Sequence, residues 1–364
     1  MHKINTRTKK SRKLMELKRL LLNSDGISRS EAATLTDLDI RTAGAYLEEL
    51  VESGLARGVV QPPKGQGRPS VLFLPNRDNL CYVGLLISAE LVVTGCIIDY
   101  DDNILSRDSF RFDKNCSKLT VFRRLLDFIK ESVVKHPEYR LTAAGIAISR
   151  WLQPPLASYD LYSGLADYLT RESGVPVYRD ININMLAYLY SKRYNCRNLA
   201  LVSPGRVIEL GMVINNFPVA KLYEHEQWLA HLTMNPQGRK CYCGKRGCLE
   251  NYVTAGALQE RWNASGGEGD FSQAVTSDDP AALKQVHNTE IILGRACREI
   301  SETYHPDLIC LPHRYKNSFD AIMKGYGNAT SELKIVDGES LTVDIGAAQL
   351  AAFLSTHQFM KTQI

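Results

Sequence analysis

The chain has 364 residues, of which 44% are hydrophobic and 23% charged, a composition typical of a folded protein with two or three domains. No stretch approaches the roughly 18 uninterrupted apolar residues of a membrane span, and the basic N-terminus lacks the apolar segment of a secretory signal. The nine cysteines are an odd number and form no small-domain disulfide framework. We therefore expect a protein of the reducing cytoplasm that makes no membrane contact.

The net charge of +4 is unevenly distributed along the chain. Residues 1–77 carry fourteen basic and eight acidic side chains, a net charge of +6, whereas the remainder has a net charge of −2. Six of the basic residues lie within the first thirteen positions, with no acid among them. A basic module on a near-neutral body favours a polyanionic partner for that module, although a solvated charged tail has the same composition.

The basic module begins with two predicted helices. Leucines at helical spacing between Leu14 and Leu22 predict a first helix that starts near Thr8 and is ended by the polar residues 23–26. Ser28 is a good helix N-cap, and Glu31 three residues later completes a capping box. A second, short helix is therefore expected to begin after Ser28.

A third helix and a hairpin complete the module. Asp39 caps a predicted helix over residues 40–54, and two short apolar strands at 55–60 and 70–74 enclose a turn rich in Pro and Gly. Three helices followed by a hairpin are typical of a winged helix-turn-helix, which we assign to residues 1–77. The third helix of such a module enters the DNA major groove.

The predicted DNA-contacting residues lie on that third helix and at the tip of the hairpin. Short residues at the start of the helix allow close approach, while longer ones reach phosphates or base edges. An arginine held between Gly and Pro at the hairpin tip suits a narrow minor groove. A winged helix used for protein contacts would look similar. The candidates are Arg41, Thr42, Gly44, Tyr46, Lys64 and Arg68.

The rest of the chain alternates predicted strands and helices, which indicates an α/β body with layered sheets. Residues 265–279 are polar and predicted to form a loop. The predicted strands are 82–87, 91–98, 103–110, 141–148, 177–179, 198–203, 208–214 and 308–311, and the predicted helices are 119–134, 161–172, 182–192, 249–263, 291–304 and 345–356.

One histidine and three cysteines are close together in the sequence: His231, Cys241, Cys243 and Cys248. Imidazole and thiolates are the ligands that Zn²⁺ prefers, and four of them close a tetrahedral structural site. Two glycines lie between the last two cysteines, where the backbone must turn tightly to bring the sulfurs around one ion. The spacing predicts a structural zinc site, and the alternative is a set of reduced surface or core cysteines.

These features together resemble the ROK family (repressor, open reading frame, kinase), and in particular its branch of transcription factors. The resemblance covers nearly the whole chain. It rests on the Gly-Arg-Pro wing, on ESGVPVYRDININMLAYLY at 172–190, on HLTMNPQGRKCYCGKRGCLENYV at 231–253, and on DIGAAQLAAF at 344–353. The cysteine cluster is the most specific of these motifs.

The resemblance implies an α/β body of two actin/hexokinase-like lobes behind the winged helix-turn-helix, with a cleft between the lobes. It also implies a homodimer or homotetramer that binds a double-stranded DNA operator. On this basis we expect a first lobe of residues 78–195 plus 345–364, and a second lobe of residues 196–344 that carries the zinc site.

The motifs that ROK kinases use for catalysis are degraded. The phosphate loop after the first strand reads LISAE at 86–90, without glycine, and the second reads SPGRVIE at 203–209. The aspartate that accepts the sugar hydroxyl proton in the kinases is replaced by Asn182, whose amide cannot act as a base. The sequence therefore predicts no catalytic residue and no enzyme activity.

The sugar cleft is altered as well. Trp228 replaces a glutamate that contacts sugar hydroxyls in the family, while the metal-binding His231 remains. Either the ligand differs from a simple hexose, or the cleft no longer binds sugar. The candidate ligand contacts are Asn182, Asn184, Trp228, His231 and Glu250.

The leading hypothesis is therefore a DNA-binding regulator of carbohydrate uptake or metabolism genes, which we expect to be a repressor. Its α/β body is expected to sense a sugar-like molecule. One alternative is a regulator that needs no ligand and has a vestigial cleft. The other is an ATP-dependent sugar kinase with an added DNA-binding module, which the missing base and phosphate loops argue against.

Overall fold

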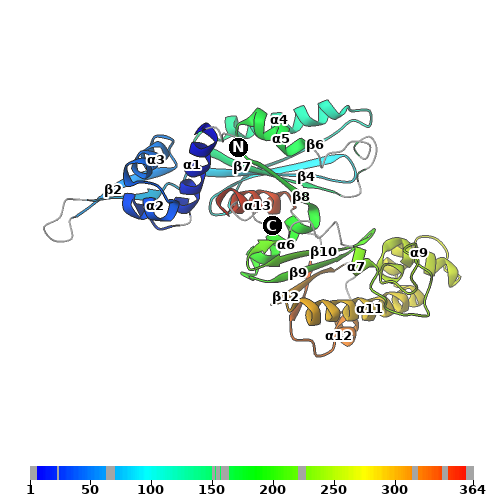
Figure 1. The fold of residues 1–364 in the computed structure, drawn as a ribbon. Coiled ribbons are helices and arrows are strands. Elements are labelled where there is room, and N and C mark those ends of the chain that lie inside the picture. The colour runs from blue at the N-terminus through cyan, green and yellow to red at the C-terminus, as the bar shows by residue number, and fades with distance from the viewer. Residues whose placement is uncertain are drawn as a thin grey trace. The chain divides into compact units, whose positions relative to one another are not determined.

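The computed structural model describes residues 6–22, 24–62, 70–149, 152, 156, 164–219, 227–313, 319–337 and 343–357. The chain divides into two compact units, one of Met1–Arg179 with Ala347–Ile364 and one of Asp180–Gly346 (Figure 1). Within the described ranges, no helix combines the length and the apolar character that a membrane crossing requires.

The first unit begins with three helices, α1 (Thr6–Leu22), α2 (Arg29–Thr36) and α3 (Ile40–Glu52), followed by a hairpin of β2 (Ala56–Gln61) and β3 (Ser70–Pro75). This is the order that the sequence predicts for a winged helix. A short strand, β1 (Ile27–Ser28), pairs with β3 and was not predicted. Small and leucine side chains from all three helices form the core of the module: Leu17, Leu21, Leu22, Ala32, Ala33, Ala43, Leu47 and Leu50.

The predicted helix caps are confirmed. The Ser28 hydroxyl accepts the backbone N–H of Glu31, and the Glu31 carboxylate accepts the backbone N–H of Ser28 at 2.8 Å. The Asp39 carboxylate accepts the backbone N–H of Thr42 at 2.9 Å. Both caps satisfy helix N–H groups that have no partner inside the helix, so local sequence alone defines where α2 and α3 begin.

Arg77 joins the winged-helix module to the first sheet. Its guanidinium donates to the backbone carbonyls of Leu22 and Ser24, at 2.8 and 2.9 Å, and lies 5.2 Å from the centre of the Tyr100 ring. Leu22 is the last residue of α1, so the cation meets the carbonyl end of the helix, where positive charge is favourable.

The first sheet has the strand order β6-β5-β4-β7-β8. The strands β4, β5 and β6 form an antiparallel meander, and β7 runs parallel to β4. The helix α4 packs on one face in an apolar core that also receives α5. The elements are β4 (Leu80–Ile87), β5 (Val92–Asp99), β6 (Ile104–Arg111), α4 (Lys118–Lys135), β7 (Arg140–Ile148), α5 (Leu165–Ser173) and β8 (Val177–Ile181).

The second sheet repeats this topology with the order β11-β10-β9-β12-β13, again an antiparallel meander followed by two parallel strands. A repeated sheet with helices is the arrangement expected of an actin/hexokinase-like body. The elements of the second unit are α6 (Asn182–Arg193), β9 (Leu199–Pro204), β10 (Ile208–Ile214), β11 (Phe217–Pro218), α7 (Gln227–Ala230), α8 (Glu250–Val253), α9 (Ala255–Ala264), α10 (Phe271–Thr276), α11 (Pro280–Tyr304), β12 (Leu308–His313), α12 (Phe319–Tyr326) and β13 (Glu332–Asp337). The last described helix, α13 (Val343–His357), lies mostly in the first unit, which takes in the residues from Ala347.

The division between the units lies earlier than the predicted lobe boundary at residue 195. The helix α6 packs on β9 and β10 and therefore belongs to the second unit. The packing is close at Gly211 of β10, where a Cβ would lie 2.4 Å from the Ile183 carbonyl oxygen. Only the absence of a side chain at Gly211 permits this approach.

Several predicted elements differ from the structure. The predicted helix 249–263 is two helices, because Thr254 is extended and caps α9. The predicted loop 265–279 contains α10, whose Phe271 is buried. The helix predicted at 291–304 begins eleven residues earlier, where Asp279 caps α11 ahead of a proline. The elements α12 and β13 were not predicted.

Candidate metal centre, ligand contacts and DNA-binding surface

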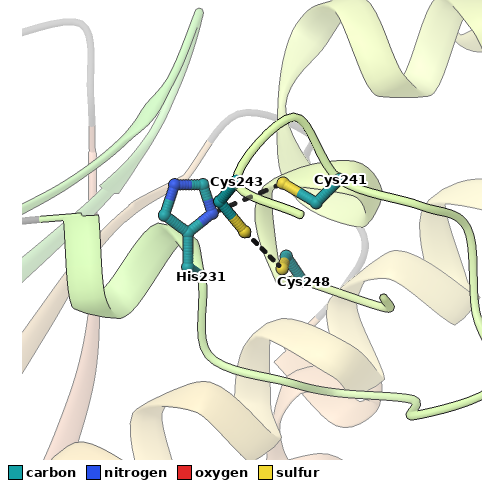
Figure 2. A group of neighbouring side chains, drawn as sticks. All are labelled: His231, Cys241, Cys243 and Cys248. Carbon is teal, nitrogen blue, oxygen red and sulfur yellow. Dashed lines mark hydrogen bonds between the residues drawn. The ribbon is translucent and has the colours of Figure 1, made fainter. Parts of the chain in front are cut away.

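The four predicted metal ligands are brought together by the loop between α7 and α8. The Nδ1 atom of His231 lies 3.4 Å from Cys241 Sγ, and the sulfurs of Cys243 and Cys248 lie 3.6 Å apart (Figure 2). All four ligand atoms lie within 4.8 Å of one another. Tetrahedral zinc with bonds of about 2.0–2.3 Å places its ligand atoms roughly 3.5–3.8 Å apart, so the cluster can hold one metal ion.

Backbone geometry explains why the loop carries glycine next to these cysteines. Gly247 has φ +66°, and a Cβ on it would lie 1.6 Å from the Asn235 carbonyl oxygen. Gly244 has φ +91° and follows Cys243 in a tight turn closed by a hydrogen bond from its N–H to the Cys241 carbonyl. Glycine alone fits both positions without strain, so the ligand spacing and the glycines act together.

The electrostatics of the cluster favour a bound cation. Burial, followed by the neighbouring sulfurs, raises the pKa of the Cys248 thiol to about 12, and burial also raises the pKa of Cys241. A hydrogen bond from the backbone of Lys245 lowers the pKa of the exposed Cys243. Three thiolates this close together repel one another, and a divalent cation removes that repulsion.

The second ring nitrogen of His231, Nε2, has no hydrogen-bond partner in the described part of the chain. His231 is 7% exposed, and its Nε2 atom is buried without a hydrogen bond among the described residues. Metal-bound histidines usually donate this second N–H to a carboxylate, a carbonyl, water or a ligand. An orphaned ring nitrogen therefore marks a place where a polar ligand group would be stabilised.

Two asparagines of α6 have similar unpaired atoms. The Oδ1 atoms of Asn182 and Asn184 are buried without partners in the described part of the chain. The amide of Asn184 donates to Asp180 at 3.0 Å, which fixes its orientation. The helix α6, which carries both asparagines, and α7, which ends one residue before His231, both pack against β10.

Glu250 adjoins the metal cluster. Its Oε2 atom lies 3.5 Å from the Tyr242 hydroxyl, and the Tyr242 ring meets the His231 ring edge-on with 5.0 Å between centroids. Burial raises the pKa of Glu250, and the charge of His231 opposes that shift. Tyr242 was not predicted as a site residue, although its place in the sequence between two candidate metal ligands was a signal. Trp228 belongs to α7, but its side chain is outside the described residues.

The predicted DNA contacts on α3 do not all face outward. Arg41 is exposed, whereas Thr42 and Tyr46 are half-buried. Gly44 is buried, and a Cβ on it would lie 3.1 Å from the Cδ atom of Arg29. The glycine therefore serves the packing of α2 on α3, and its contact with DNA stays a prediction. Lys64 and Arg68 lie in residues 63–69, outside the described part of the chain.

The first degraded phosphate loop is a closed turn between β4 and β5. The N–H of Ser88 donates to the Val92 carbonyl at 2.8 Å, and the Ser88 hydroxyl accepts the N–H groups of Glu90 and Val92 at 3.3 Å. Arg111 donates to the Glu90 carbonyl at 2.9 Å. These amides are used inside the turn and are not available to a phosphate.

The second degraded phosphate loop is the tight turn between β9 and β10. Pro204 pairs with Ile208, and the N–H of Gly205 donates to the Val207 carbonyl at 2.9 Å. The Gly205 carbonyl accepts the N–H of Ala255 at 2.9 Å, which ties the turn to α9. The Gly205 amide is therefore used inside the turn, as the amides of the first loop are.

Comparisons with known proteins agree with this architecture. The model of the ROK family matches residues 95–317. The xylose repressor of Bacillus spizizenii is 23% identical over 342 aligned positions, and the match covers 90% of this chain and 88% of that protein.

Two solved structures share the fold. A ROK family transcriptional regulator described as a homologue of the E. coli MLC protein has a TM-score of 0.67 at 18% identity, and the match covers 95% of this chain and 96% of that one. The ROK hexokinase from Thermus thermophilus has a TM-score of 0.62 at 18% identity, with 75% of this chain and 99% of the hexokinase covered. The fold therefore occurs in regulators and in kinases, and residues must distinguish them.

Proposed function

The chain belongs to the ROK family, and we propose that it is a DNA-binding transcriptional repressor of carbohydrate uptake or metabolism genes. The observation that carries the proposal is the N-terminal module of three helices, two of them capped, and a hairpin, with Arg41 exposed on the third helix. The similarity to a xylose repressor, which extends over 90% of the chain, supports it.

We further propose that the body does not catalyse phosphoryl transfer. Both loops that would hold phosphate use their backbone groups in tight turns, and Asn182 offers an amide where a kinase needs a base. These two features support a regulator over the kinase alternative, whose fold is the same.

The proposed metal is a structural zinc ion held by His231, Cys241, Cys243 and Cys248. The donor set of one imidazole and three thiolates suits zinc, and four protein ligands leave no open position for water. The ion would hold the loop between α7 and α8 in place, and with it His231 and Glu250.

The proposed effector is a sugar or a sugar derivative. The buried, unpaired atoms of Asn182, Asn184 and His231 support this, because hydroxyl groups can satisfy them, and Glu250 adds a carboxylate. Trp228 is a further proposed contact, in place of a polar one. An effector acts by binding the DNA-free and DNA-bound states with different affinity. The alternative is a vestigial cleft in a regulator that needs no ligand.

The proposed partner is a double-stranded operator in the cytoplasm, bound by a homodimer or homotetramer. Two winged helices on one assembly read two half-sites, and the spacing of the half-sites follows from the spacing of the modules. All nine cysteines are free, which agrees with a reducing compartment.

Operator binding is expected to weaken steeply with salt. Phosphate contacts release counterions, so the logarithm of the association constant falls linearly with the logarithm of salt concentration.

Replacement of Arg41 by alanine is expected to weaken operator binding by about tenfold, the loss of one good contact. Gel retardation of the gene's own upstream DNA measures both. The matched control Arg171→Ala removes an exposed arginine of the body and should bind normally. Absence of retardation at low salt would refute the proposal.

Effector binding is expected to stabilise the protein. A sugar present at about 100 times its dissociation constant adds roughly 2.7 kcal/mol, which raises the melting temperature by several degrees. The shift should be lost in Glu250→Gln and kept in Glu260→Gln, whose carboxylate forms an exposed ion pair with Arg239. Thermal unfolding over a panel of sugars and sugar phosphates tests this. A panel without any shift supports the vestigial cleft.

A further inference from the structure

The outward face of α3 is short of polar groups that can read DNA. The buried side of the helix is formed by Ala43, Gly44, Leu47 and Leu50. Three residues in the first half of the helix are exposed, Ile40, Arg41 and Ala45, and Thr42 between them is half-buried. Arg41 is the only basic residue of α3, so two of these three side chains are apolar.

The acids of the same helix are held by neighbouring cations. Glu48 pairs with Arg29 of α2, and Glu49 pairs with Lys10 of α1 at 3.0 Å. The Arg29 side chain also lies over the Phe73 ring and against Gly44, so its direction is fixed by packing. The charge of Glu48 is therefore balanced by Arg29. Among the exposed residues in the first half of α3, Arg41 is therefore the polar one, and Ile40 and Ala45 offer apolar contacts.

Ile40 is the unexplained member of this face. It is the first residue of α3, and its side chain is 59% exposed. The major groove offers one apolar group, the C5 methyl of thymine, and aliphatic side chains recognise it. We infer that Ile40 and Ala45 contact thymine methyl groups, so the operator half-site carries thymines beside the base read by Arg41. This inference rests on the proposed operator binding.

The test removes only the methyl groups. A randomised duplex library is enriched on the full-length protein, and the selected half-site is then synthesised with deoxyuridine in place of each thymine in turn. Loss of one contacted methyl is expected to weaken binding about fourfold, the effect of exposing one CH₂-sized group. The Ile40→Ala protein should bind the thymine site more weakly and should no longer distinguish thymine from uracil at one position.

Two further variants make the result specific. Arg41→Ala should weaken binding to thymine and uracil sites by the same factor and so keep their ratio. Val51→Ala removes a similar aliphatic side chain, 36% exposed, from the far end of α3 and should also keep the ratio.

The possible failures are distinguishable. A protein that selects no DNA refutes the proposed function. A protein that binds DNA with equal affinity for thymine and uracil refutes the methyl contacts. A thymine preference that Ile40→Ala leaves unchanged shows that other residues read the methyl groups and also refutes the inference.

Discussion

Replacement of Cys248 by serine is expected to reduce bound zinc from one ion per chain to well below one, and to lower the free energy of unfolding by several kcal/mol. Cys248 is fully buried, and its sulfur lies 3.6 Å from Cys243 Sγ. Zinc binding is worth about 10–16 kcal/mol in peptides that fold around it, and a hydroxyl is a much poorer ligand than a thiolate. Loss of the ion should also release His231 and Glu250, so any effector response should disappear with it.

The matched control is Cys196→Ser. The Cys196 sulfur donates to the Asn198 carbonyl at 3.2 Å, a contact that a serine hydroxyl can keep, and it lies outside the metal cluster. Zinc is measured with a colorimetric chelator after denaturation, and stability by thermal unfolding with and without added chelator. A Cys248→Ser protein that keeps one zinc per chain and the wild-type melting temperature would contradict the structural role of the cluster.

Replacement of Gly145 by alanine is expected to destabilise the first unit by roughly 3 kcal/mol, the upper part of the range for overpacking. A Cβ on Gly145 of β7 would lie 1.9 Å from the carbonyl oxygen of Ala347 in α13. The obstacle is backbone, so a side-chain rotation cannot relieve it, and α13 must move away from the sheet. The buried surface of Leu350 and Ala351 would then be partly exposed.

The same substitution at Gly256 is the control. Gly256 is exposed in the first turn of α9, with nothing within 4 Å of the added methyl group, so alanine should stabilise by up to about 1 kcal/mol through its higher helix propensity. Chemical denaturation measures both variants. Equal stability of Gly145→Ala and the wild-type protein would show that α13 does not pack on β7 as closely as the structure places it.

Capping residues in the sequence predicted where α2 and α3 begin. The sequence predicted the helices and strands inside the second unit less well. The caps at Ser28 and Asp39 were predictable because each involves residues three positions apart. The helix α10 was missed, since a stretch rich in Gly, Ser and Asp hides the buried Phe271 and Val275. The strand β13 is short, and its place depends on pairing with β12.

The cluster of the four candidate metal ligands was predictable, because the ligand types and their spacing lie within eighteen consecutive positions, 231–248. The ligand contacts were less so. The sequence predicted Asn182 and Asn184 from a family resemblance, but only the fold shows that their Oδ1 atoms are buried and unpaired. Tyr242 and its contacts with His231 and Glu250 also required the structure.

By itself the sequence determined the kind of protein: a basic module of capped helices, a cysteine and histidine cluster, and two degraded phosphate loops, the first without glycine. These are short-range features, and their chemistry follows from residues close together in the chain. Tertiary structure decided how the residues are used. It buried Gly44 beneath Arg29, paired Glu48, left Ile40 exposed and placed the unit boundary ahead of α6. Those outcomes depend on which segments, distant in the sequence, pack together. The spacing of residues along a single segment does not determine that packing.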